Sequence, residues 1–349
     1  MKKMLLPAII AAVIVPMLSH GVDWSELKAN PHIAPAITNR TEALAFFAEN
    51  VYGARPERTT AMKEKVLESV EVKFREGVEA VRKTIEIDTM TPLGPTKFRA
   101  VAYFPKGIAK APVFVYVSFH EATATENPRW PIGAILKRGA ATVGIYYNDV
   151  LKDDAKVFGS IKRAPNACGA ISTWSFAASR VMDYLETEPL ADVAHVAIVG
   201  HSRLGKTSLW TGANDTRFAM ACVNDSGCFG ARLHAMNISG ETIGWITGMF
   251  PHWFAPKCRE QYRGKDYELP FDQHSLLMCV APRILCVGSA DGDWWACPSG
   301  EFAGWLVAAN AWKNKEAVDY HVRHGIHDIT LEDWNRYLDV AKRNGWRCE

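Results

Sequence analysis

The sequence has little net charge, and it lacks both internal repeats and the paired ligand motifs of structural metal sites. Its 40 lysines and arginines nearly balance 38 aspartates and glutamates, which leaves a formal net charge of +2. Such a balance favours neither nucleic acid nor an anionic membrane surface as a partner. No C-x-x-C or H-x-x-x-H pair occurs in the chain, so we expect no structural zinc site.

The chain also lacks low-complexity tracts and linkers rich in proline, glycine or serine. We therefore expect a single domain over residues 21–349, long enough to bury a large core. Before it, two lysines precede an apolar run over residues 4–18, which Pro7 and Pro16 interrupt. This pattern is typical of a secretory signal peptide, and no other segment is long enough to cross a bilayer. We predict a signal peptide over residues 1–20 and a secreted or periplasmic protein without membrane contact after its removal.

Eight cysteines suit an exported protein without fixing any disulfide. Cys222, Cys279 and Cys286 stand within apolar runs, where cysteine acts as a small core residue. The other five stand near predicted turns or the C-terminus and are the better candidates for bridges: Cys168, Cys228, Cys258, Cys297 and Cys348.

Predicted strands and helices alternate along most of the chain. Helix-like spacing predicts two N-terminal helices, at residues 41–51 and 58–70. Apolar runs then predict strands at residues 84–88, 98–103, 113–118, 141–147, 196–199, 219–223, 284–287 and 317–322. Further helices are predicted at residues 130–136, 169–186, 275–278, 301–312 and 331–342. Such alternation implies a mostly parallel central sheet covered by helices on both faces, a three-layer αβα sandwich.

The segment AHVAIVGHSRLGKTSLW carries a serine between a strand and a helix. The apolar run at residues 196–199 ends at Gly200, and Ser202 and Gly205 precede a helix-forming stretch. A strand, a sharp turn and a helix in this order expose the nucleophile of an α/β-hydrolase. The same turn brings the N-terminal amides of the helix toward the oxyanion.

The same residues have a second interpretation. Gly200–Thr207 spells G-x-x-x-x-G-K-[ST], the phosphate-binding loop of nucleotide hydrolases, and Asp225 could imitate its magnesium-binding acid. Such loops usually follow an early strand, whereas this one lies past the midpoint of the chain. The predicted leader also sends the protein to a compartment that normally lacks ATP. We therefore favour the hydrolase, in which Lys206 suits an anionic or polar substrate.

A histidine is expected in the loop after the last strand of an α/β-hydrolase. The strand predicted at residues 317–322 is followed by His324 and His327. His327 is favoured as the base, because Gly325 lets the loop turn just before it.

The acid of such a triad stands between the serine and the histidine in the chain. Asp225 ends the strand after the nucleophile helix, and Asp291 and Asp293 follow the next strand. A carboxylate at either place could orient the histidine, or could cap a turn beside glycine and serine.

Residues 227–270 form an irregular insertion between two predicted strands, and they are rich in aromatic side chains. In α/β folds such an insertion overlies the C-terminal ends of the strands, where ligands bind. The 12 tryptophans of the chain suit sugar rings as well as an ordinary core.

The serine turn departs from G-x-S-x-G, because Leu204 takes the place of the second glycine and Gly205 follows it. The form G-x-S-R-x-G-K resembles the glucuronoyl esterases, carbohydrate esterase family 15, of the bacterial type. Other stretches between about residues 50 and 342 are similar to the same family, in order and without large gaps. They are WPIGAILKRGAATVGIYYNDV, NDSGCFGA, GETI, FPHWF, LPFDQH, APR, DWWACPSGEF and HDITLEDW.

The resemblance implies a serine esterase that cleaves the ester between 4-O-methyl-glucuronic acid on xylan and lignin alcohols, through an acyl-enzyme. It implies Ser202 as nucleophile, His327 as base and Arg203 as the arginine that helps the oxyanion. The family acid often stands as Glu at the position of Asp225, and other members place an acid at the position of Asp293. We expect both aspartates to contribute, Asp225 more than Asp293.

The resemblance also implies that Lys206, Glu241 and Trp295 hold the uronate sugar of a glucuronoxylan or lignin–carbohydrate ester. We expect a monomer, and this hydrolytic chemistry needs no metal and no organic cofactor. Cys297 departs from the Asp common at its position in the family. The alternative is another carbohydrate or small-ester hydrolase, such as a deacetylase. An inactive sugar-binding module is the alternative from a different class.

Overall fold

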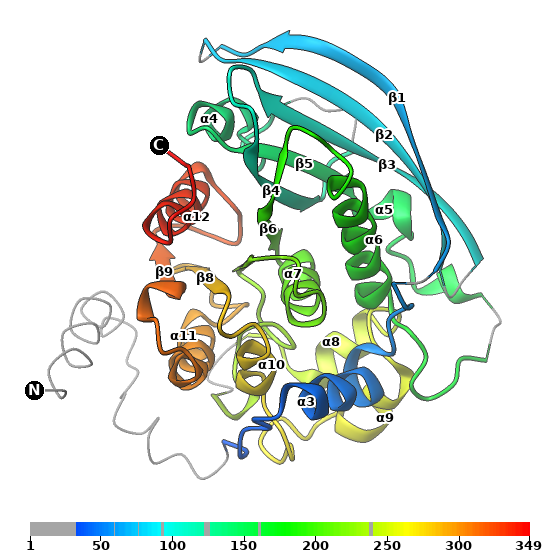
Figure 1. Ribbon diagram of the computed structural model, residues 1–349. Coiled ribbons are helices and arrows are strands. Elements are labelled where there is room, and N and C mark those ends of the chain that lie inside the picture. Colours follow the sequence, from blue (N-terminus) through cyan, green and yellow to red (C-terminus); the bar gives the residue numbers. More distant parts are fainter. Residues whose placement is uncertain are drawn as a thin grey trace, which may run out of the picture.

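A nine-stranded sheet forms the centre of the computed structural model (Figure 1). The structure describes residues 33–349 except 59, 76, 92–93, 122–125, 160–161 and 237–239, so the predicted leader lies outside the described residues. The strand order is β1-β2-β3-β5-β4-β6-β7-β8-β9. The strands are β1 (Met62–Lys73), β2 (Glu79–Thr91), β3 (Gly94–Pro105), β4 (Ala111–Ser118), β5 (Ala141–Tyr146), β6 (Ala191–His201), β7 (Met220–Asn224), β8 (Ile284–Ala290) and β9 (Val318–Arg323).

Antiparallel pairing is confined to one side of this sheet. β1, β2, β3 and β5 pair antiparallel in that order, and the pairs from β5 through β4 and β6 to β9 are all parallel. The expectation of a mostly parallel sheet is therefore confirmed, with the addition of an antiparallel extension.

Helices cover both faces of the sheet, as predicted. They are α3 (Arg40–Phe47), α4 (Ile132–Lys137), α5 (Tyr147–Val150), α6 (Ala170–Leu185), α7 (Arg203–Asn214), α8 (Ile243–Met249), α9 (Pro256–Tyr262), α10 (His274–Met278), α11 (Pro298–Ala308) and α12 (Leu331–Arg343). Figure 1 shows α4 and α12 on one side of the parallel strands and α6 and α7 on the other. These layers confirm the αβα sandwich of an α/β-hydrolase. Helices α8 and α9 belong to the predicted insertion at residues 227–270.

The helix predicted at residues 58–70 is wrong, because this region forms β1. Most of β1 is exposed, so it lacks the apolar alternation that identifies a half-buried strand, and its many Lys and Glu residues favour a helix. Continuous pairing with β2, from Met62 opposite Thr89 to Lys73 opposite Glu79, overrides that propensity. The helix predicted at residues 41–51 is confirmed, as α3 followed by a π-helical turn.

All eight cysteines lie within the described residues, and all are buried free thiols. The five predicted bridge candidates therefore form no disulfide in the part of the chain that the structure describes. Cys168 Sγ lies 3.5 Å from the Thr173 hydroxyl, and Cys297 Sγ lies 4.0 Å from the Met236 carbonyl oxygen. Their positions near turns were misleading, because each side chain points inward and packs as a small core residue.

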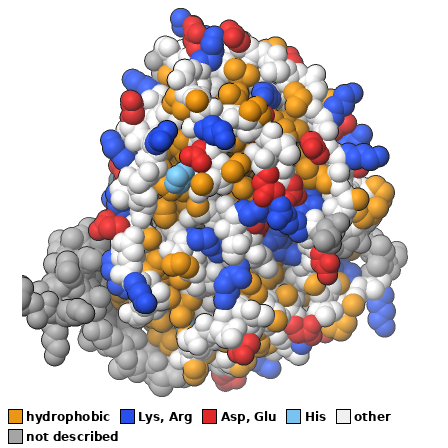
Figure 2. Space-filling model, in the orientation of Figure 1, with side chains coloured by type: hydrophobic (Ala, Val, Ile, Leu, Met, Phe, Trp, Pro, Cys, Tyr) orange, Lys and Arg blue, Asp and Glu red, His pale blue; other side chains and the backbone are white. Residues whose placement is uncertain are grey.

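The surface follows the balanced composition of the chain. Basic and acidic side chains are interspersed on the face shown in Figure 2. Within the described ranges, no helix has both the length and the apolar character needed to cross a membrane.

Candidate active site

Ser202 stands on a sharp turn between β6 and α7. Its φ of 59° and ψ of −127° are unusual for a residue with a side chain. Two glycines make the turn possible. A Cβ on Gly200 would clash with the Leu204 carbonyl oxygen, and one on Gly205 would lie 2.7 Å from the Asn224 carbonyl oxygen. The turn therefore presents the Ser202 hydroxyl above the sheet at the start of a helix, as the sequence predicts.

His327 links this hydroxyl to a buried carboxylate. Its Nε2 lies 2.8 Å from Ser202 Oγ, and its Nδ1 donates to Asp293 Oδ2 at 2.5 Å. Backbone bonds hold the two loops together, because Gly292 N–H donates to the Gly325 carbonyl oxygen at 2.8 Å. The geometry thus brings together a serine, a histidine and an acid in the arrangement that activates a nucleophile.

The other two candidates in these loops face elsewhere. His324 Nδ1 lies 2.9 Å from Asp291 Oδ2, and the His324 side chain is 97% exposed. This pair lies at the surface and closes the turn that precedes His327, so the preference for His327 over His324 agrees with the geometry.

Asp225, the other candidate acid, is engaged by an arginine. Its Oδ1 accepts the Ala290 N–H at 2.8 Å, and its Oδ2 accepts Arg323 Nη2 at 3.1 Å. Burial raises the pKa of Asp225 well above its usual range, with help from the nearby Glu301 and Asp293 carboxylates and against the opposing charge of Arg323. The hydrogen bond to His327 thus comes from Asp293, whereas Asp225 anchors the strand end beside it.

Arg323 is a residue of this site that the sequence analysis missed. Its guanidinium is buried at the end of β9 and also donates to Asp333 Oδ2 at 2.8 Å and to the Ile326 carbonyl oxygen at 2.9 Å. It therefore ties the loop that carries His327 to Asp225 and to the start of α12. A basic residue directly after the last predicted strand was the available signal.

His201 lies beneath the catalytic histidine candidate. The ring centroids of His201 and His327 are 4.5 Å apart, and His201 Nδ1 lies 2.7 Å from Asn224 Oδ1. Burial and then the neighbouring His327 hold the pKa of His201 well below its usual value. A neutral ring at this place supports His327 without adding a positive charge under it.

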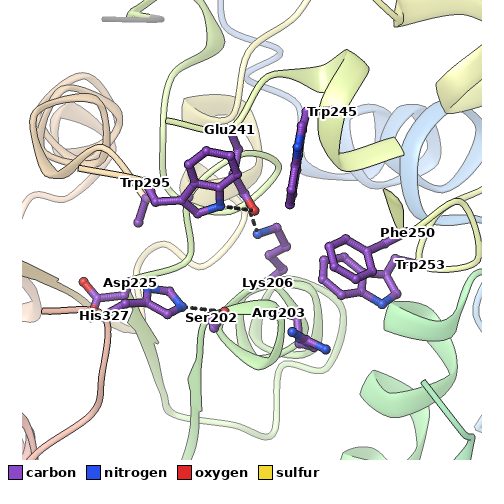
Figure 3. Close-up of a pocket in the computed structure, with 12 residues that line it drawn as sticks. Ser202, Arg203, Lys206, Asp225, Glu241, Trp245, Phe250, Trp253, Trp295 and His327 are labelled. Carbon is purple, nitrogen blue, oxygen red and sulfur yellow. Dashed lines mark hydrogen bonds and ion pairs between the residues drawn. The ribbon is translucent and has the colours of Figure 1, made fainter. Parts of the chain in front are cut away.

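A pocket of about 210 Å³ opens beside Ser202 and His327 (Figure 3). Lys206 Nζ is buried, donates to the Ser226 carbonyl oxygen at 2.6 Å and lies 3.4 Å from Glu241 Oε2. Trp295 Nε1 donates to Glu241 Oε1 at 3.2 Å. Figure 3 shows the Glu241 carboxylate between the side chains of Lys206 and Trp295, so the three predicted substrate residues are joined to one another.

Aromatic residues from the insertion form the rest of the wall. Trp245, Phe250 and Trp253 line the pocket, and the rings of Trp245 and Trp295 meet edge to face at 4.6 Å. No role was predicted for these three residues from the sequence. The aromatic content of residues 227–270 and the FPHWF stretch were the signals that could have identified them.

Arg203, the first residue of α7, also lines the pocket. Its guanidinium lies over the rings of Trp253 and Phe250, at 4.7 and 5.4 Å from their centroids. It forms an ion pair with Asp153, another residue that the sequence analysis missed.

Within the described part of the chain, Asp225, Asp293 and His327 form a group that could suit a metal ion, because one ligand atom of each lies within 4.8 Å of the others. Their atoms are already used in hydrogen bonds to Arg323 and between His327 and Asp293. The phosphate-loop interpretation fits poorly as well, because Lys206 faces a carboxylate that would repel a phosphate. The arrangement suits acid–base and nucleophilic chemistry.

Comparison with known proteins gives a consistent set of relatives. A family model described as glucuronyl esterase, fungi, matches residues 95–315. Carbohydrate esterase MZ0003, from an unknown prokaryotic organism, is 32% identical over 86% of this chain and 83% of its own length. The 4-O-methyl-glucuronoyl methylesterase of Hypocrea jecorina is 31% identical over 44% of this chain, a match that spans 35% of that relative.

Solved structures of esterases are similar to this protein over most of its chain. The glucuronoyl esterase from Solibacter usitatus has a TM-score of 0.79 at 30% identity, over 88% of this chain and 92% of that one. A promiscuous CE15 esterase from a marine bacterial metagenome has a TM-score of 0.76 at 30% identity, over 87% and 90% of the two chains. The sheet and helices described above are therefore those of solved esterases.

Proposed function

Because the chain belongs to the glucuronoyl esterases of carbohydrate esterase family 15, we propose that it cleaves the ester between 4-O-methyl-glucuronic acid on xylan and lignin alcohols. Membership makes it a carboxylic ester hydrolase that acts on esters of glucuronic acid. The observation that carries the finer proposal is the hydrogen-bonded series Ser202, His327 and Asp293 beside a pocket lined by Lys206 and Glu241.

The proposed reaction proceeds through an acyl-enzyme. Ser202 Oγ attacks the ester carbonyl carbon while His327 Nε2 takes its proton, and Asp293 holds the opposite ring nitrogen. Arg203 stabilises the oxyanion of the tetrahedral intermediate through its guanidinium and backbone N–H. His327 then gives the proton to the departing alcohol. Water, deprotonated by the same ring, releases the glucuronate and restores Ser202.

The pocket suits the uronate sugar of a neutral ester. Lys206 and Glu241 are placed to bond sugar hydroxyls, and Trp295 and Trp245 offer apolar ring faces. The Lys206 charge is balanced by Glu241 and the Arg203 charge by Asp153. A pocket whose charges cancel favours the uncharged ester over the free carboxylate product.

Asp225 has a supporting role in this proposal. It keeps Arg323 in place, and Arg323 in turn holds the loop of His327. Asp293 is therefore the acid that we assign to the triad, with Asp225 as a contributor to its surroundings.

A comparison of two substrates tests the proposal. The purified protein is expected to hydrolyse benzyl glucuronate much faster than it deacetylates acetylated xylan. The opposite preference would favour the deacetylase, a candidate kept because one structural relative is described as a promiscuous esterase. Loss of both activities, with Ser202 unlabelled by a fluorophosphonate, would favour an inactive sugar-binding module.

We further propose a secreted or periplasmic monomer that has neither nucleic acid nor membrane as a partner. The basic and apolar composition of residues 1–20 and the near-neutral charge support this proposal. N-terminal sequencing of protein recovered from the medium or periplasm tests removal of the leader. Light scattering of the same sample tests the monomer, because a dimer would double the expected mass.

A further inference from the structure

Four donors converge on the carboxylate of Asp153, which follows α5. Trp253 Nε1 donates to its Oδ1 at 2.6 Å, and His252 Nε2 lies 2.7 Å from the same oxygen. Its Oδ2 receives the Arg203 guanidinium and, at 3.3 Å, the Tyr147 hydroxyl. The Asp153 side chain is only 7% exposed, so these donors replace water around it.

An ionised carboxylate is the side chain that can satisfy all four donors. Burial alone would raise the pKa of Asp153, but hydrogen bonds from His252 and Trp253 and the charge of Arg203 lower it to about 2. An asparagine would have to turn its NH₂ group toward one pair of donors, either His252 and Trp253 or Arg203 and Tyr147. Replacing one oxygen of Asp153 by an NH₂ group therefore removes two of the four hydrogen bonds that the carboxylate accepts.

Asp153 and the aromatic rings around it fix the position of the Arg203 guanidinium. Beyond the ion pair with Asp153, the guanidinium lies between the rings of Trp253, Phe250 and Phe119. Its buried Nε has no hydrogen-bond partner among the described residues. The guanidinium is thus held through one nitrogen and its flat faces, in the pocket that contains Ser202.

We propose that Asp153 is a positioning residue for ester hydrolysis, which holds the Arg203 guanidinium where the oxyanion of the tetrahedral intermediate develops. The inference rests on the proposed function, in which Arg203 stabilises that oxyanion. Asp153 also orients Trp253, whose ring lies against Arg203 on the pocket wall.

The first test compares Asp153→Asn with Asp154→Asn. Asp154 is the matched control, because it is the exposed neighbour and its carboxylate only accepts the Lys156 N–H at 2.8 Å. Misplacement of a transition-state group by about 1 Å costs about 100-fold. We expect a kcat loss of that size for Asp153→Asn on benzyl glucuronate with KM changed by less than about threefold, and wild-type kinetics for Asp154→Asn.

The second test is chemical rescue of an Arg203 variant, so the proposal can be tested even if Asp153→Asn by itself is unstable. Arg203→Ala leaves a space bounded by Asp153 and the aromatic rings, which free guanidinium ion can enter. We expect about 50 mM guanidinium chloride, far below unfolding concentrations, to raise the turnover of Arg203→Ala several-fold over a matched NaCl control. The same salt should leave Arg203→Ala/Asp153→Asn unchanged, because the anchoring carboxylate is gone.

Two results would overturn the proposal. One is a folded Asp153→Asn variant with wild-type kcat, and the other is equal guanidinium rescue with and without Asp153. Both tests are repeated with p-nitrophenyl acetate, which shares the oxyanion but lacks the sugar. If the wild type cleaves that ester but not benzyl glucuronate, the proposed substrate fails while the role of Asp153 is still measured.

Discussion

Replacing Asp293 by asparagine separates the two candidate acids most sharply. Asp293 Oδ2 accepts from His327 Nδ1 at 2.5 Å, and this bond fixes both the tautomer and the orientation of the ring. An asparagine amide can direct its NH₂ at Nδ1 and so favour the tautomer that cannot accept the serine proton. In a comparable triad this exchange lowers kcat by about 10⁴-fold, or about 5.5 kcal/mol.

The matching Asp225→Asn variant should behave differently. Asp225 accepts from Ala290 N–H and Arg323 Nη2, and Arg323 keeps its bond to Asp333 when the Asp225 carboxyl is replaced by an amide. We therefore expect kcat to fall by about tenfold or less and the free energy of unfolding to fall by about 1–3 kcal/mol, the usual cost of leaving a buried hydrogen-bonding group without its partner.

The assay is kcat on benzyl glucuronate for both single variants and the double variant, with urea unfolding of each. The double variant should be little slower than Asp293→Asn alone, because residues that act as one unit are not additive. If Asp225→Asn loses as much turnover as Asp293→Asn at unchanged stability, the assignment of Asp293 to the triad is refuted.

Two further predictions concern the substrate and acid stability. We expect Lys206→Ala and Trp295→Ala each to lower kcat/KM on benzyl glucuronate by about 10- to 100-fold, because each removes one strong polar contact or one aromatic ring face from the sugar. Hydrolysis of phenyl acetate, which has no sugar, should change little. Equal losses on both substrates would show that these residues are structural. The pKa of Asp153, about 2 in the fold, lies below the unfolded value of about 3.9, so its contribution to stability is full above about pH 5 and disappears as pH falls toward 2. Urea unfolding between those pH values should therefore show a steeper loss of stability for the wild type than for Asp153→Asn, and parallel curves would contradict this.

The serine turn and the histidine loop could be predicted because both are local features. Gly200, Ser202 and Gly205 specify a tight strand-to-helix turn within a few residues, and His327 follows the last strand directly. The layers of the fold were predictable for a similar reason, because apolar runs of strand length alternate with helical patterns.

The choice between Asp225 and Asp293 lies beyond what the sequence specifies. Both follow neighbouring parallel strands, so both reach the same edge of the sheet. Which of them contacts His327 depends on the backbone hydrogen bonds between the loops of Asp293 and His327 and on Arg323, which donates a hydrogen bond to Asp225. These are long-range contacts, which residue spacing does not encode.

The remaining differences have physical causes of the same kind. β1 has little apolar alternation because it is the exposed edge of the sheet, and Asp153 lies 50 residues before its partner Arg203. A buried carboxylate that collects donors from distant segments gives no signal in its own neighbourhood.

The turnover of benzyl glucuronate by the wild type and by Ser202→Ala, measured under identical conditions, decides whether this protein is an esterase with Ser202 as its nucleophile. We expect rapid hydrolysis by the wild type and a kcat loss of at least about 10⁴-fold in the variant, with the same circular dichroism spectrum and melting temperature. Comparable turnover by a folded Ser202→Ala variant, or no hydrolysis by the wild type, would contradict it.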